Sequence, residues 1–253
     1  MLFRSHYEEP QYQYPYRFVS GQHINQPFGY IAERLFVDDK EAQNSPPQSF
    51  GSAIQPQGGD IKYRDVNKDG IINQDDQVPL GLPTTPEIIY GFGFSVGYKG
   101  FDLNAFFQGL ARESFFVNPT AQNSRYYGLY GTAPFVNNAQ ILKSYADNHW
   151  SEENQNLYAL WPRLSTTENV NNEQQSSWWL RDGSFMRLKS LEIGYSLPKA
   201  VARRMYMDNL RIYFNGLNLM TWSHFKLWDP EMAGQGFGYP IQKVFNVGIN
   251  VNL

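Results

Sequence analysis

The stretch IIYGFGFSVGYKGFDLNAFFQG, residues 88–109, decides the fold class because apolar residues alternate on both sides of a tight turn. In its first half, every second residue from Ile88 to Tyr98 is large and apolar, and most residues between them are Gly or Ser. Lys99 and Gly100 supply the turn, and the second half alternates again. Because a period of two places alternate side chains on opposite faces of a β-strand, the stretch predicts an antiparallel hairpin.

The alternation returns three times near the end of the chain. The stretches are FMRLKSLEIGYSLP (185–198), NLRIYFNGLNLMTW (209–222) and VFNVGINVNL (244–253). Over residues 190–197, 210–215 and 245–253, Leu, Ile, Val and aromatic residues fill one face. Ser, Gly, Asn, Glu192, Arg211 and Tyr213 fill the other. Together with the hairpin they predict five strands, each with roughly the ten residues that a tilted strand needs to cross a bilayer.

The two faces favour a transmembrane barrel over a soluble sandwich. A sandwich carries charged residues on its outer face, whereas the polar face here is mostly Gly, Ser and Asn. Tyr98 and Phe101 flank the tight turn, as an interfacial aromatic girdle does. The expected fold is therefore all-β, an antiparallel transmembrane β-barrel segment of about five strands with long extracellular loops.

The lengths of the connections support a barrel. The tight turn and the short connection 198–208 fall on one side of the predicted sheet, and the long connections 110–184 and 222–240 fall on the other. Barrel proteins place short turns in the periplasm and long loops outside the cell. We therefore expect residues 1–86 to form an extracellular loop region, and residues 87–253 to form the C-terminal barrel strands with their outer loops.

The composition of the 253-residue chain excludes several classes of protein. A net charge of -3 provides no basic stripe for nucleic acid, and the lack of cysteine rules out disulfides and thiolate metal sites. No apolar run approaches the roughly 18 residues of a transmembrane helix. The first residues lack the apolar core of a signal peptide, so for an exported protein we expect the true beginning to lie outside this chain.

The stretch DVNKDGIINQDD, residues 65–76, carries oxygen-bearing side chains at the spacing of an EF-hand calcium loop. Gly70 stands where such a loop turns sharply, and Ile72 is expected to anchor the loop to what lies beneath it. No helix signal flanks the loop, so we expect a structural Ca²⁺ that braces an extracellular segment. The alternative is an Asx-rich turn that uses the same residues without metal. The expected ligands are Asp65, Asn67, Asp69, the Ile71 backbone carbonyl, Asn73 and Asp76.

Several motifs together resemble one family. GDIKYRDVNKDGIINQDDQVPLG, followed by YGFGFSVGYKGFDLNAFFQG, closely resembles the C-terminal region of SusC/RagA-type TonB-dependent transporters. PFGYIAERLF near the start and SFMRLKSLEIGYSLP, LRIYFNGLNLMTW, DPEM and VFNVGINVNL later in the chain match the same family in the same order. The resemblance implies a multi-pass β-barrel protein of the cell outer membrane, part of a plugged, 22-stranded barrel. It also implies import of oligosaccharides, or peptides, together with a SusD-like surface lipoprotein.

The departures from the family pattern matter as well. TonB relays energy to these transporters through an N-terminal part that this chain lacks, as it lacks the plug and most of the barrel. Because five strands cannot close a barrel, the resemblance implies a C-terminal fragment of a longer protein. The family often has Gly where this chain has Lys68, which is expected to project from the loop without disturbing its ligands.

Aromatic residues are concentrated in the long connection at 110–184. Rings of this kind stack on sugars and hold peptide side chains, so contact with substrate or with the lipoprotein is one interpretation. The other, which we favour, is that the rings pack together to hold a long loop in shape. The tryptophans concerned are Trp150, Trp161, Trp178 and Trp179, with Tyr126, Tyr127, Tyr130 and Tyr158 beside them.

Catalysis is not expected. The four histidines are scattered, and neither an HExxH box nor a GxSxG elbow occurs. Asp229 and Glu231, in WDPEM, have the residue types of a glycosidase pair, but the resemblance makes DPE a loop motif. The alternative function is a secreted, calcium-dependent carbohydrate-binding β-module without transport, such as a dockerin. Dockerins carry a second copy of the calcium loop, which this sequence lacks.

Overall fold

The computed structural model describes residues 3, 8–48, 50–51, 55–117, 141–167, 169–236 and 238–252. The chain divides into two compact units. The first comprises Met1–Thr85, Ser114–Arg181 and Ala233–Phe237, and the second comprises Pro86–Glu113, Asp182–Met232 and Gly238–Leu253. Most of the long connection therefore belongs to the same unit as the N-terminal region. Within the described ranges, no helix is long and apolar enough to cross a membrane.

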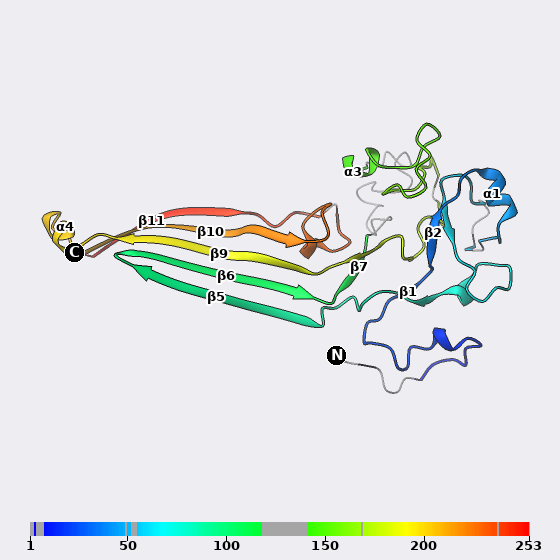
Figure 1. The fold of residues 1–253 in the computed structure, drawn as a ribbon, viewed down its shortest axis with the longest axis horizontal. Helices are drawn as coiled ribbons and strands as arrows, with labels where there is room; N and C mark the ends of the chain where they lie inside the picture. Colours follow the sequence, from blue (N-terminus) through cyan, green and yellow to red (C-terminus); the bar gives the residue numbers. More distant parts are fainter. Residues whose placement is uncertain are drawn as a thin grey trace. The chain divides into compact units, whose positions relative to one another are not determined.

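The second unit is built on one antiparallel sheet whose strands run side by side (Figure 1). Its strands, in spatial order, are β11 (Val244–Asn252), β10 (Asn209–Ser223), β9 (Phe185–Ser196), β6 (Phe101–Ala111) and β5 (Ile88–Tyr98). All five lie at the ranges that the alternation predicted, with ends shifted by no more than two residues. Strands β5 and β11 each pair with one neighbour within the described part of the chain.

The connections between these strands differ greatly in length. Lys99 and Gly100 join β5 to β6 with φ of 48° and 89°, and two positive values are characteristic of the tight type I′ hairpin turn. Helix α4 (Lys199–Arg204) occupies the short connection between β9 and β10. The short 3₁₀ helix η4 (Pro230–Met232) lies in the longer connection between β10 and β11.

The register of the sheet places like residues in rows across all five strands. One row on the first face is apolar, and the adjacent row on the opposite face is polar. The apolar row is Val96, Leu103, Ile193, Phe214 and Val247, and the polar row is Ser95, Asn104, Glu192, Asn215 and Asn246. The two-faced character that the sequence predicted strand by strand is therefore continuous across the sheet.

The first unit contains short elements around an aromatic core. Its paired strands are β1 (Phe28–Gly29) with β4 (Val78–Pro79), β2 (Ala32–Leu35) with β3 (Ile61–Tyr63), and β7 (Ser114–Phe116) with β8 (Leu180–Asp182). Its helices are α1 (Asp39–Asn44), α3 (Lys143–Ala146) and the 3₁₀ helices η1 (Pro15–Arg17) and η2 (Gln74–Asp76). Fully buried side chains include Tyr30, Leu35, Phe36, Ile61, Tyr63, Tyr145, Trp161 and Trp179.

Candidate functional site

The calcium-like loop closes through its own carboxylates. Asp65 accepts hydrogen bonds from the backbone N–H groups of Lys68 at 2.6 Å and Gly70 at 2.9 Å. Asp76 is fully buried and accepts from the backbone N–H groups of Val66 at 2.7 Å and Asn73 at 2.9 Å. Gly70 has φ of 86°, so the sharp turn expected at the sixth position is present. The loop thus has its ends and its turn fixed by backbone contacts.

The residues suit Ca²⁺ by type, because all the expected donors are oxygen atoms. Ile72 is only 2% exposed and its N–H donates to the Pro47 carbonyl, so the loop is anchored as expected. Lys68 has φ of 61°, a left-handed conformation that glycine adopts without strain. This conformation explains why the family often has Gly where this chain has Lys68. Within the described residues, however, no three His, Asp or Glu side chains converge as metal ligands. The calcium site therefore stays a prediction, as does its alternative, the metal-free Asx turn.

A segment before the first paired strands packs against this loop. Arg17 forms an ion pair with the carboxylate of Asp75, and the Tyr16 hydroxyl donates to the Asp75 carbonyl at 2.7 Å. The amide of Asn67 donates to the Tyr14 hydroxyl at 3.2 Å. The loop is therefore held from outside as well as from within.

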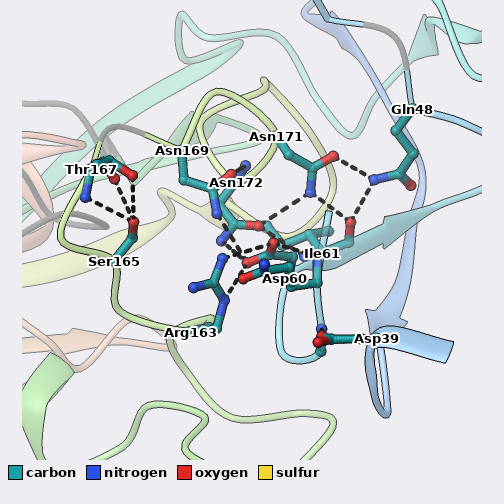
Figure 2. Close-up of polar contacts among 12 residues, drawn as sticks. Asp39, Gln48, Asp60, Ile61, Arg163, Ser165, Thr167, Asn169, Asn171 and Asn172 are labelled. Atoms are coloured by element: carbon teal, nitrogen blue, oxygen red, sulfur yellow. Dashed lines mark hydrogen bonds and ion pairs between the residues drawn. The ribbon is translucent and has the colours of Figure 1, made fainter. Parts of the chain in front are cut away.

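A buried polar cluster lies five residues before the loop, at Asp60 (Figure 2). Arg163 donates to both carboxylate oxygens of Asp60, at 3.1 and 3.2 Å, and the side-chain amides of Asn169 and Asn172 each donate at 3.0 Å. The N–H of Gln57 donates at 2.9 Å. The charge of this fully buried carboxylate is thus paired and hydrogen-bonded, as a buried charge must be.

The same cluster fixes strand β3. Asn172 accepts the Ile61 N–H at 2.9 Å, so its amide nitrogen must face Asp60. Gln48 donates to the Ile61 carbonyl at 3.0 Å and accepts the Tyr63 N–H at 2.7 Å. Because every side chain here already has its partner, the arrangement suits a structural brace between segments more than 100 residues apart. Sequence reasoning missed this cluster. The run NVNN at 169–172 is unusually rich in amides, but it does not show that Asp60 is the partner.

The four tryptophans lie in the first unit, and three of them are buried. Trp161 and Trp179 are 0% and 1% exposed, meet edge to face at 4.5 Å, and Trp161 also stacks on Tyr145. Contact of these rings with substrate stays a prediction, and at Trp161 and Trp179 it requires the surrounding chain to open. Trp178 is half-buried and Tyr158 is exposed, whereas Tyr126, Tyr127 and Tyr130 lie outside the described residues.

One predicted contact residue, Trp150, borders an open cavity of about 500 Å³. Its ring lies so close to Gly59 that a Cβ there would come within 2.2 Å of it, and its indole N–H has no partner in the described part of the chain. The cavity has a mixed lining, in which three carboxylates and one lysine stand beside apolar residues. Its lining includes Asp38, Asp39, Lys40, Trp150, Glu152 and Gln155.

The DPE motif is an anchor for the connection between β10 and β11. The Arg187 side chain, 1% exposed, lies 2.5 Å from the Asp229 carboxylate and 3.0 Å from that of Glu231. The register pairs Arg187 with Gln108, which puts it on the polar face of the sheet. One guanidinium contacts both carboxylates and so anchors the connection. That DPE lies in a loop is as the family interpretation predicted.

A second group of charges lies on the polar face near the tight turn. Arg211 donates to Asp102 at 3.1 Å through Nε and to Glu192 at 2.6 Å through a terminal nitrogen. Asn215 donates to the other oxygen of Glu192 at 3.3 Å. Gly194 leaves room for this group, because a Cβ there would lie 2.4 Å from the Arg211 side chain. These three charged side chains therefore lie on one face of the sheet and pair with each other.

The chain is similar to curated TonB-dependent receptors. It is 32% identical over 212 residues to TonB-dependent receptor P26 of Formosa agariphila, and 29% identical over 208 residues to TonB-dependent receptor P3 of the same organism. These matches cover 76% and 77% of this chain but only 19% of each relative, so the chain spans about a fifth of their length. No protein-family model matches the chain.

Solved structures show the same fold. The RagAB peptide importer in its open-open state superposes with a TM-score of 0.57 at 21% identity, over 96% of this chain and 24% of that one. The closed-closed state of the same importer superposes with a TM-score of 0.57 at 23% identity, over 95% of this chain and 24% of that one. The resemblance first based on motifs is confirmed at this level: the curated relatives are TonB-dependent receptors, and the RagAB importer shares the fold.

Proposed function

We infer that this chain, a relative of TonB-dependent receptors, forms part of the wall and the outer loops of an outer-membrane importer. The observation that carries the proposal is the uncovered apolar face of the five-stranded sheet. On it, Phe94, Val96 and Val247 are 49%, 56% and 78% exposed. A soluble protein rarely exposes a contiguous apolar patch of this kind, whereas hydrocarbon chains of a membrane cover it without cost.

The opposite face supports the same orientation. The ion pairs of Arg211 with Asp102 and Glu192 lie there, and charges within a membrane-spanning sheet are tolerated where they face a polar interior. A secreted carbohydrate-binding module would instead expose the apolar face to water. The distribution of charge between the faces therefore favours the membrane.

The two edge strands require further strands. Unpaired backbone groups in hydrocarbon cost several kcal/mol each, so the free edges of β5 and β11 must pair with other strands. We propose that these belong to a closed, plugged barrel of 22 strands, the number expected for large plugged outer-membrane transporters. TonB would act on a part of that protein outside this chain.

The first unit is proposed to lie outside the cell. Its substrate would be an oligosaccharide or a peptide, delivered with a SusD-like surface lipoprotein. The cavity beside Trp150 offers three carboxylates and the Gln155 amide, which suit hydrogen bonds to either one. A structural Ca²⁺ held by Asp65, Asn67, Asp69, Ile71, Asn73 and Asp76 would brace this unit. The buried Asp76 and the turn at Gly70 support that part of the proposal.

Cysteine labelling tests the location and the orientation together, because the native chain has no cysteine. Lys99→Cys and Glu153→Cys are made singly in the full-length protein, and intact cells are treated with an impermeant maleimide. The proposal predicts labelling at position 153, which is exposed, and none at position 99 until the outer membrane is permeabilised. Labelling of position 99 but not of position 153 in intact cells would show that the orientation is the reverse of the proposed one. Equal labelling of both positions would contradict a membrane-spanning sheet.

A further inference from the structure

The tight turn and helix α4 lie together at one end of the sheet. The N–H of Ser196, at the end of β9, donates to the Gly100 carbonyl at 2.7 Å. Two residues later the chain enters the connection that contains α4, and Ala202 of that helix is fully buried. The helix therefore lies at the same end of the sheet as the turn that carries Lys99.

This end of the sheet is basic. The connection PKAVARRMYMD, residues 198–208, contains Lys199, Arg203 and Arg204 against one acidic residue, Asp208. All three cationic residues are exposed, and none of the ion pairs among the described residues involves them. Lys99 contacts the Tyr98 ring at 5.1 Å. The charges of the helix are thus available to an anionic ligand.

Apolar side chains are exposed beside these cations. Val201 is 43% exposed, and Met205 and Tyr206, which follow α4, are 48% and 91% exposed. The connection therefore presents apolar groups and positive charges outward together. At the same end of the sheet, Tyr98 and Phe101 are 68% and 59% exposed, as residues of an aromatic belt are. This combination is the one by which amphipathic segments lie in the interface between lipid headgroups and acyl chains.

We propose that α4 and the Lys99 turn form a binding site for the headgroups of anionic phospholipids. Lys199, Arg203 and Arg204 would contact headgroup phosphates, while Val201, Met205 and Tyr206 enter the boundary with the acyl chains. This inference rests on the proposed membrane-spanning sheet, which brings its short-turn end to the bilayer surface. Basic residues also stabilise the C-terminal end of a helix through its dipole, but that role requires no lipid.

Lipid binding to the purified full-length protein tests the site. Phosphatidylglycerol and phosphatidylcholine with the same acyl chains are titrated into the detergent-solubilised protein, and bound lipid is counted by native mass spectrometry. At about 1 kcal/mol for each cation, the triple variant Lys199→Gln, Arg203→Gln and Arg204→Gln is expected to bind phosphatidylglycerol roughly 100-fold more weakly. Glutamine is a good helix former, so the change removes charge without disfavouring α4.

A matched control carries the same loss of charge elsewhere. Three exposed lysines lie outside this end of the sheet: Lys143, Lys226 and Lys243. The triple variant Lys143→Gln, Lys226→Gln and Lys243→Gln is expected to bind phosphatidylglycerol like the wild type. Equal binding by the α4 variant and the wild type, or no preference of the wild type for phosphatidylglycerol, would overturn the inference. The wild-type protein is first located by cell fractionation. Its absence from the outer-membrane fraction would contradict the proposed function itself, separately from the lipid site.

Discussion

The guanidinium of Arg187 lies 2.5 Å from the Asp229 carboxylate although 42 residues separate them, and the Arg187 side chain is 1% exposed. The same guanidinium holds Glu231, so one side chain of β9 fixes the connection between β10 and β11. In Arg187→Met two carboxylates lose their partner, and breaking a buried pair costs about 3–5 kcal/mol. We expect trypsin to cut this connection after Lys226 much faster than in the wild type.

The control for Arg187 is Arg64→Met. Arg64 pairs with Glu33 in a mostly solvated position, with side-chain exposures of 55% and 38%. Such a pair contributes about 1 kcal/mol or less, so cleavage after Lys226 should not change. Equal resistance of the Arg187 variant and the wild type would show that the DPE anchor is dispensable.

Asp60 is expected to be the most sensitive position of the first unit. Asp60→Asn places an amide against five donors and leaves Arg163 uncompensated, at a cost of about 3 kcal/mol. Thermal unfolding followed by fluorescence of the buried Trp161 and Trp179 should report a clear loss of stability. The matched variant Asp75→Asn, at a carboxylate with 41% exposure, should cost about 1 kcal/mol or less. Equal melting temperatures for the two variants would contradict the brace.

The lowered pKa of Glu41 predicts that the stability of the first unit depends on pH. Hydrogen bonds from Arg34, and further ones from Lys62 and the Val37 N–H, lower the pKa of Glu41 from 4.5 to about 2. Because the folded pKa is depressed, the stabilisation is present above 4.5 and is lost as the pH falls toward about 2. Hydrogen exchange in α1, corrected for the intrinsic rate, should therefore lose protection over this window.

Glu41→Gln should lower the protection of α1 at neutral pH and flatten its change between pH 4.5 and about 2. Glu33→Gln serves as the control, since its pair with Arg64 is largely exposed and should leave the profile unchanged. A Glu41→Gln protein that keeps the wild-type pH profile would rule out this carboxylate as the source.

The calcium proposal is tested by removing charge while keeping the hydrogen bonds. Asp65→Asn with Asp69→Asn keeps oxygen acceptors for the N–H groups of Gly70 and Ile71 but removes two of the three carboxylates. If Ca²⁺ braces the loop with roughly millimolar affinity, this variant in calcium buffer should be cleaved after Lys68 as fast as the wild type in chelator. A wild-type loop that resists trypsin equally with and without chelator would instead support the metal-free Asx turn.

The sequence predicted the sheet well because its information is local. Each strand shows its own period of two, and the turn at Lys99 and Gly100 is specified by adjacent residues. The shift of register between Leu217 and Met220, in the pairing of β10 with β9, was not predicted. It coincides with Asn218, whose φ of 55° is a backbone conformation that the sequence does not show. One-residue irregularities of this kind depend on the neighbouring strand.

The first unit was predicted poorly because its contacts are distant. Asp60 and Asn172 are 112 residues apart, and neither has a periodic neighbour to reveal its partner. Likewise Trp161 and Trp179 belong to an irregular segment, where spacing does not distinguish a buried ring from one that meets a ligand. The DPE motif was placed correctly in a loop, but its partner Arg187 is known only from the fold.

The accessibility of residues along β5 to oxygen and to a water-soluble reagent tests most directly whether the sheet spans the membrane with its apolar face toward lipid. Single cysteines at Phe94, Ser95, Val96 and Gly97 in the reconstituted full-length protein are spin-labelled, and collisions with oxygen and with a water-soluble nickel chelate are measured. We expect high oxygen and low nickel collision rates at positions 94 and 96, which face lipid, and the reverse at positions 95 and 97. Equal and high nickel collision rates at all four positions would contradict it.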